Sequence, residues 1–194
     1  MFSLLAATLA RRSVWPWLAI AITLAAVTFQ LRYQGRLWLC SCGRLFFWVG
    51  EARSTNTSQH LFDPYSFTHV LHGVVLFWLL MLFAPRLWWS WQLWLAVSVE
   101  AVWEVIENSD FVIQRYRDAG VLGYFGDTIV NSLGDMAMCG FGFVLARYLG
   151  FGRSLALFAA MEVVLLFWIR DSLVLNVVML IYPVEWIEQW QAGY

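Results

Sequence analysis

Long apolar runs constrain the fold of this chain more than any other feature of its sequence. A helix of about 20 apolar residues crosses the hydrocarbon core of a bilayer, and runs of this kind lie near 14–31, 67–84, 88–107, 127–149 and 155–182. Hydrophobic residues make up 61% of the 194 residues, more than is usual in soluble domains. We therefore predict an all-α fold, a polytopic membrane helix bundle that forms one integral membrane domain over residues 1–194.

The last apolar run is interrupted by polar residues. The stretch "FWIRDSLVLN" places Arg170, Asp171 and Asn176 inside it. A run of this length either tilts as one helix or breaks into two. The bundle is accordingly expected to have five transmembrane helices, or six if the last run is a broken pair.

The apolar runs indicate the lipid bilayer as the partner of this chain, and its charge indicates no other. The formal net charge of −1 gives no reason to expect nucleic acid as a partner. Loops rich in Arg tend to stay on the cytoplasmic side, and the Arg11–Arg12 pair and the short turns that hold Arg86 and Arg153 share one side of the predicted topology. We therefore place the N-terminus in the cytoplasm and the longer polar connections, 34–65 and 109–126, across the membrane.

Ionisable and amide side chains recur at one end of the predicted spans. His69 and His72 open the second span, Glu100, Glu104 and Glu107 end the third, Asp127, Asn131 and Asp135 open the fourth, and Arg170, Asp171 and Asn176 lie in the second half of the fifth. Starts of even-numbered spans and ends of odd-numbered spans face the same side. We therefore predict that all four motifs converge on one membrane face.

Such a convergence favours a functional pocket. Taken singly, each histidine could be a core residue, and each carboxylate could pair with an Arg. Together they supply the nitrogen and oxygen donors that a divalent metal ion takes, or an acid/base set for phosphate or ester chemistry. The candidate catalytic residues are Glu104, Glu107, Asp127, Asp135, His69, His72 and Asn131, the candidate metal ligands are His69, His72, Glu104, Asp127 and Asp135, and the candidate substrate-binding residues are Arg115, Arg117 and Arg170.

A second group of metal-binding residue types precedes the second span. Cys40 and Cys42 form a C-x-C pair, which we expect to make a poor disulfide because it closes a small, strained ring. The pair is either half of a metal site, with His60 as a further ligand, or two small residues that pack in a turn.

The motifs "SQHLFDPYSFTHVLHG", "EAVWEVIENSDFVIQRYR" and "GDTIVNSLGD" resemble those of an uncharacterised bacterial membrane-protein family, known mainly from proteobacteria and described as a domain of unknown function. The resemblance runs from about Cys40 to Pro183. We expect a multi-pass protein of the bacterial inner membrane, and the orientation predicted from the arginines places the polar pocket at the periplasmic face. The order of His, Glu and D-x-x-x-N-x-x-G is also similar, more loosely, to VanZ-like membrane proteins, some of which are linked to glycopeptide-antibiotic resistance.

Two functions fit these features. The first is a metal-assisted hydrolase or transferase that acts on a lipid or a lipid-linked phosphate at the bilayer surface. The alternative is a non-enzymatic component, either a metal-handling or transport protein that uses Cys40, Cys42 and His60 or an accessory subunit of a larger membrane complex.

Overall fold

The computed structural model describes residues 14–52, 54–118 and 124–193. Within these residues the chain is helical, as predicted, and pairs as β-structure only at an isolated bridge between Trp48 and Phe62. The helices are α2 (Trp15–Tyr33), α3 (Ser66–Phe83), α4 (Trp89–Glu107), α5 (Asp110–Asp118), α6 (Ile129–Ile169), α7 (Leu173–Ile181) and α8 (Glu185–Ala192). The Arg11–Arg12 pair, on which the predicted orientation depends, lies outside the described residues.

Among the described residues, three helices, α2, α3 and α6, are long and apolar enough to cross a membrane. That is fewer than the five or six spans expected from the sequence. Helix α4 has 19 residues, about the length of a span, but Glu100, Glu104 and Glu107 lower its hydropathy. The expected fourth span (127–149) and the first part of the expected fifth span (155–182) belong to one helix, α6.

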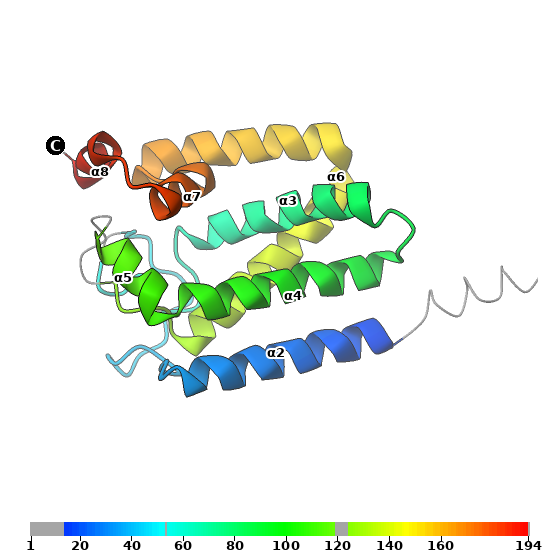
Figure 1. Cartoon of the computed structure of the whole chain (residues 1–194), viewed down its shortest axis with the longest axis horizontal. Coiled ribbons are helices and arrows are strands. Elements are labelled where there is room, and N and C mark those ends of the chain that lie inside the picture. Colours follow the sequence, from blue (N-terminus) through cyan, green and yellow to red (C-terminus); the bar gives the residue numbers. More distant parts are fainter. Residues whose placement is uncertain (1–13, 53, 119–123, 194) are drawn as a thin grey trace, which may run out of the picture.

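Helix α6 is two helical segments joined at a glycine. Its 41 residues would extend about 60 Å as a straight helix, twice the thickness of a hydrocarbon core. Gly150 interrupts it with φ 72° and ψ 176°, a conformation open essentially to glycine alone. Figure 1 shows that the chain reverses there, so that residues 151–169 run back along the bundle.

The last apolar run is a broken pair of helices. Helix α6 ends at Arg170, which has a left-handed backbone (φ 55°), and α7 begins after Ser172. The Ser172 hydroxyl caps α7 by accepting from the N–H of Leu175, and Glu162 accepts from the N–H groups of Leu173 and Val174 at 2.9 and 3.3 Å. The freed amides at the start of α7 are therefore satisfied by side chains.

Helices α3 and α6 pack backbone against backbone. A Cβ atom added at Gly73 would lie 2.0 Å from the carbonyl oxygen of Cys139, and one added at Gly142 would lie 2.0 Å from that of Val70. Small residues allow such close approach between helices in membranes. The contact places the beginning of α3 against the middle of the first segment of α6, residues 129–149.

The core lies between α2, α3, α4 and α6 and is built from apolar side chains. Its buried residues include Leu31, Val74, Phe77, Ala96, Val97, Ile129, Met136, Phe143 and Ala146. At one end of this bundle, as Figure 1 shows, the end of α4 meets α5 and the loops of the chain, near the starts of α3 and α6. The polar motifs named from the sequence gather at this end.

Candidate functional site

His69 lies at the centre of a group of buried carboxylates. Its Nδ1 atom is 2.5 Å from Glu100 Oε1 and 3.7 Å from Glu104 Oε1, and its Nε2 atom is 3.8 Å from Asp135 Oδ2. His72, one helical turn along α3, has its Nδ1 atom 3.0 Å from both oxygens of Glu100. We call His69, His72, Glu100, Glu104, Glu107 and Asp135 the carboxylate–histidine cluster.

Glu104 differs from the other carboxylates of the cluster in lacking hydrogen bonds. It is fully buried, and neither side-chain oxygen has a hydrogen-bond partner among the described residues. The Oε2 atom of Glu107 is likewise buried without a partner. Ligand atoms of His69, Glu104 and Glu107 all lie within 4.8 Å of one another, and so do those of His69, His72 and Glu100. Either triad has a spacing that could hold a metal ion.

Asp135 is held in place from the loop before α3. The Ser66 hydroxyl donates to Asp135 Oδ1 at 2.7 Å and accepts from the backbone N–H of Asp63 at 3.2 Å. The Asp63 carboxylate accepts from the N–H groups of Ser58 and Tyr65 at 2.7 and 2.8 Å. Burial raises the pKa of Asp63 above its ordinary value, although these two donors act against the rise.

Asp127 lies beside the cluster with its own set of donors. Asn108 Nδ2 donates to one carboxylate oxygen at 2.8 Å, and the Tyr124 hydroxyl donates to the other at 2.9 Å. Asn108 Oδ1 in turn accepts from the N–H of Asp127 at 2.7 Å. Asp127 is therefore satisfied by protein groups. Asn131, 1% exposed, has neither a donor nor an acceptor for its side-chain amide.

The motif that contains Arg170, Asp171 and Asn176 is connected to the cluster through Tyr116. The Tyr116 hydroxyl on α5 lies 3.0 Å from Glu107 Oε1 and 3.0 Å from Asn176 Oδ1 on α7. Because one hydroxyl has a single proton, it donates to one of these two oxygens at a time. Asn176 thus joins the site, while Arg170 is directed elsewhere.

The three arginines proposed from the sequence as substrate-binding residues do not share a site. Arg115 donates to the carbonyl oxygens of Leu180 and Ile181, and Arg170 donates to that of Trp190. Arg117 donates to the carbonyl oxygen of Tyr124 and borders a cavity. Within residues 14–52, 54–118 and 124–193, the ion pairs of the cluster come from its two histidines.

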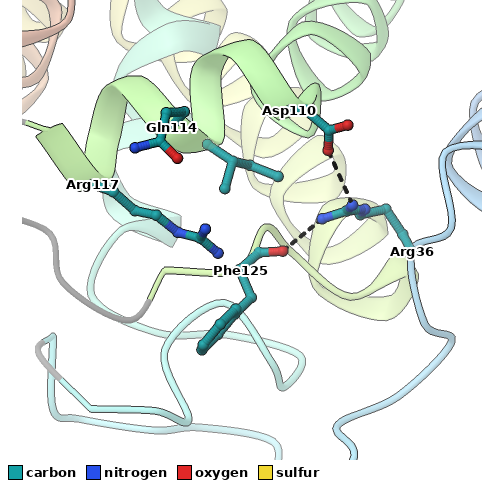
Figure 2. Close-up of a pocket in the computed structure, with 6 residues that line it drawn as sticks. Arg36, Asp110, Gln114, Arg117 and Phe125 are labelled. Atoms are coloured by element: carbon teal, nitrogen blue, oxygen red, sulfur yellow. Dashed lines mark hydrogen bonds and ion pairs between the residues drawn. The ribbon is translucent and has the colours of Figure 1, made fainter.

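The cavity beside Arg117 is a pocket of about 340 Å³. It is lined by Arg36, Asp110, Ile113, Gln114, Arg117 and Phe125, and Figure 2 shows the two guanidinium groups on either side of Phe125. Arg36 donates to the carbonyl oxygen of Phe125, and the Arg117 guanidinium lies 5.0 Å from the centre of the Phe125 ring. Arg36 also pairs with Asp110, 3.9 Å away. The lining therefore carries two positive charges and one negative charge, and its net positive charge suits an anion.

Gly126 separates this pocket from Asp127. The residue has φ 85°, and a Cβ atom there would lie 2.3 Å from Arg36 NH1 and 3.0 Å from Asn108 Oδ1. No side chain therefore fits between the arginine and the asparagine that holds Asp127. A ligand in the pocket lies against the segment that carries Asp127.

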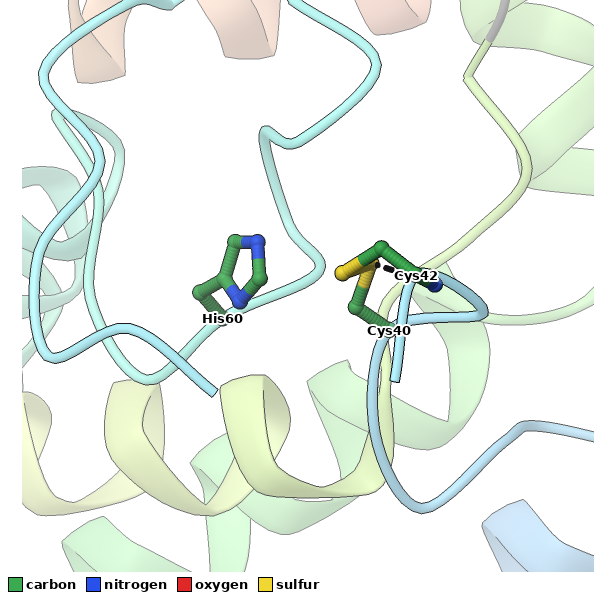
Figure 3. A group of neighbouring side chains, drawn as sticks. All are labelled: Cys40, Cys42 and His60. Atoms are coloured by element: carbon green, nitrogen blue, oxygen red, sulfur yellow. Dashed lines mark hydrogen bonds between the residues drawn. A yellow bond between two sulfur atoms is a disulfide. The ribbon is translucent and has the colours of Figure 1, made fainter. Parts of the chain in front are cut away.

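Cys40 and Cys42, which we expected from the sequence to make a poor disulfide, are joined by one. A turn closed by the Gly43 N–H donating to the Cys40 carbonyl oxygen at 3.0 Å brings the two Cα atoms to 5.1 Å, inside the range that a disulfide spans. Figure 3 shows His60 facing the pair. Burial lowers the pKa of His60 below its ordinary value, so the ring is neutral at pH 7.

Sequence reasoning named Glu100 in the convergent motif but not among the candidate catalytic or metal-binding residues, and it left out Arg36. Glu100 stands one turn before Glu104 on the same face of α4, so helical spacing could have identified it. Arg36 carried no such signal, because its place depends on where the 34–65 loop meets Phe125.

The arrangement favours metal-assisted or acid/base chemistry. Buried carboxylates without donors need a cation or a proton, since an unpaired buried charge is strongly unfavourable. Histidines held by a carboxylate are also the usual form in which imidazole binds a metal or shuttles a proton.

Comparison with known proteins gives the family of the chain. Residues 31–193 match the family described as "Protein of unknown function (DUF2585)". The chain is 42% identical to a UPF0314 protein of Paracoccus denitrificans over 94% of its own length and 95% of that protein, and 41% identical to one of Brucella anthropi over 91% and 90%. A UPF0314 protein of Rhizobium meliloti is 38% identical over 91% of each chain. No solved structure matches. The chain belongs to the DUF2585 family, and the predicted family is confirmed.

Proposed function

We propose that this DUF2585 protein is a metal-dependent membrane hydrolase or transferase that acts on a lipid or a lipid-linked phosphate. The observation that carries the proposal is Glu104, a fully buried carboxylate with no hydrogen-bond donor, grouped with His69 and Glu107 within 4.8 Å. Native proteins leave few buried polar atoms unsatisfied, so a cation is the natural partner for these oxygens.

The residues take different roles in this proposal. His69, Glu104 and Glu107 hold a divalent metal ion, which would polarise a phosphoryl or ester oxygen and lower the pKa of a bound water. Glu100 orients His69 and His72 through their Nδ1 atoms. Asp135, on the other side of His69, acts as a further ligand or a base, and Asn131 and Asp127 orient the substrate.

The pocket lined by Arg36 and Arg117 holds the anionic headgroup. It opens beside α5, at the end of the bundle where the cluster lies, and Gly126 lies between Arg36 and Asn108, the residue that holds Asp127. Guanidinium groups bind phosphate strongly because they donate in pairs. The substrate's phosphate would then lie near the carboxylates that act on it.

The proposed topology completes this picture. Five segments cross the inner membrane: residues 15–33, 66–83, 89–107, 129–149 and 151–169. Helix α4 turns its glutamates into the bundle, as is usual for intramembrane carboxylates. The N-terminus lies in the cytoplasm, and the cluster and both polar connections lie at the periplasmic face. A larger membrane complex remains the alternative context, in which the same site binds metal without turnover.

A turnover assay tests this function. The purified protein in vesicles that contain a phospholipid or a polyprenyl phosphate is expected to release or transfer the phosphate or headgroup, measured by mass spectrometry. Glu104→Gln should lower turnover by about 100-fold or more. Arg36→Gln and Arg117→Gln should each raise KM by about tenfold, the equivalent of one charge-assisted hydrogen bond.

Arg44→Gln is the matched control, because Arg44 is exposed in the same loop as Arg36 and does not line the pocket. Unchanged turnover in Glu104→Gln would exclude the metal-assisted mechanism. Binding of metal without turnover on any lipid phosphate or ester would favour the metal-handling alternative.

A further inference from the structure

The Cys40–Cys42 disulfide adds little to the stability of the fold. A disulfide stabilises mainly by restricting the unfolded chain, and the effect grows with the length of the closed loop. This disulfide joins residues only two positions apart. Its stabilising effect is therefore near the lower limit for a disulfide. A chemical role explains the presence of this bond better than a structural one.

The two sulfur atoms stand in different surroundings. Cys42 is exposed, whereas Cys40 is 7% exposed. The backbone N–H of Cys42 donates to Cys40 Sγ at 3.1 Å, as the dashed line in Figure 3 shows. An incoming thiolate can reach Cys42, and Cys40 is the sulfur that already accepts a hydrogen bond.

His60 lies beside the same pair of sulfur atoms. The side chain is 1% exposed, its Nδ1 atom accepts from the N–H of Phe46 at 3.3 Å, and its Nε2 atom has no partner. A ring nitrogen of His60 and both Sγ atoms lie within 4.8 Å of one another. Since Nδ1 accepts, the neutral ring carries its proton on Nε2.

This proton position argues against a metal site here. A metal ligand must offer a lone pair, and Nε2–H offers a proton while Nδ1 is occupied by Phe46. A buried N–H donor beside a sulfur is instead suited to stabilise a thiolate, and a leaving thiol with a lowered pKa leaves faster.

We propose that Cys40 and Cys42 form a thiol–disulfide exchange centre that oxidises a dithiol of a partner protein. A thiolate of the partner attacks Cys42 Sγ, forms a mixed disulfide and releases Cys40 as a thiolate stabilised by the N–H of Cys42 and by His60. The second thiol of the partner, as its thiolate, then attacks the mixed disulfide. The partner leaves with a disulfide, and Cys40 and Cys42 are left reduced by two electrons.

Mass spectrometry with reduced glutathione tests the exchange. The purified full-length chain is mixed with glutathione, quenched with N-ethylmaleimide and cleaved for peptide mapping. Glutathione is expected on Cys42 and maleimide on Cys40. Cys139, which is fully buried, should carry neither and serves as the internal control. The reverse assignment, or a disulfide that resists glutathione under conditions that reduce an exposed reference disulfide, would overturn the proposal.

Variants of His60 test the second donor. His60→Phe keeps an aromatic ring against Phe46 and removes the donor, and it should slow the exchange by about tenfold. His60→Gln keeps an N–H donor and should retain most of the rate. Equal loss in both variants, at unchanged thermal stability, would rule out a donor role for His60.

The reduced chain is also titrated with Zn²⁺ alone. Little or no stoichiometric binding supports the exchange centre. Tight binding that disappears in His60→Phe would overturn it and establish a metal site in its place.

Discussion

Glu104 and Asp127 are two buried carboxylates that the protein holds in different ways. Asp127 accepts from Asn108 and Tyr124, so protein donors replace the water it lost on burial. Glu104 has no such donor. Desolvating an ionised carboxylate without compensation costs several kcal/mol, which is why the proposed metal ion is assigned to Glu104 and not to Asp127, one of the ligands expected from the sequence.

Two glycines on α6 allow a matched test of the packing that positions the cluster. Gly142→Ala would place a Cβ atom 2.0 Å from the carbonyl oxygen of Val70, and overpacking of this kind costs about 1–3 kcal/mol or more. Gly140→Ala meets only Val97 and Leu93 side chains at 3.8 and 3.9 Å, so alanine's helix propensity should leave stability unchanged or slightly raised.

The measurement is thermal unfolding of both variants in detergent. Gly142→Ala should lower the midpoint clearly, and Gly140→Ala should not. If both variants unfold at the wild-type temperature, α3 and α6 are not in backbone contact, and the proximity of His69 to Asp135 loses its structural basis.

At the scale of helices, the reversal at Gly150 divides α6 into two apolar segments. Each segment is about as long as the hydrocarbon core of a bilayer is thick. Gly150→Ala forces a side chain into a backbone conformation that costs about 1–3 kcal/mol. Gly152→Ala, two residues on, has open space around its Cβ atom and no positive φ. Unfolding midpoints should therefore fall for Gly150→Ala alone, and an equal fall in both would mean that the reversal is not at Gly150.

Helical periodicity anticipated much of the candidate site. The spacing of Glu104 and Glu107 on α4, and of Asn131 and Asp135 on α6, placed each pair on one face, and counting spans brought these faces to the same end as His69. The structure places ligand atoms of His69, Glu104 and Glu107 within 4.8 Å of one another.

The contacts made by loops could not be predicted from the sequence. Arg36 meets Phe125 across 89 positions of the chain, and no local pattern encodes such a contact. The disulfide was missed because a general argument about ring strain ignored the turn at Gly43, which sets the Cα separation. The described residues contain fewer helices that are long and apolar enough to span a membrane than the sequence led us to expect, because glutamates lower the hydropathy of α4 and the last two apolar runs are continuous in α6.

For the whole molecule, we predict that the loops beside the cluster lie on the same side of the membrane. In a Cys40→Ser/Cys42→Ser background, cysteines introduced at exposed Asn56 and Gln114 should react with a membrane-impermeant maleimide added to intact cells. Cysteines at exposed Arg86 and Arg153 should react only after the cells are opened. Labelling of Asn56 and Arg86 positions from the same side would contradict the proposed topology.

The metal site is the central claim, and binding of Mn²⁺ followed by electron paramagnetic resonance tests it most directly. Wild-type protein is expected to bind about one Mn²⁺ per chain through oxygen and nitrogen ligands, and Glu104→Gln should abolish this binding while Glu51→Gln, at an exposed glutamate, retains it. In chelator, Glu104→Gln should be at least as stable as the wild type, because it removes a buried carboxylate that accepts no hydrogen bond from the described residues. Absence of bound Mn²⁺ in the wild type, or equal binding in Glu104→Gln, would contradict the account.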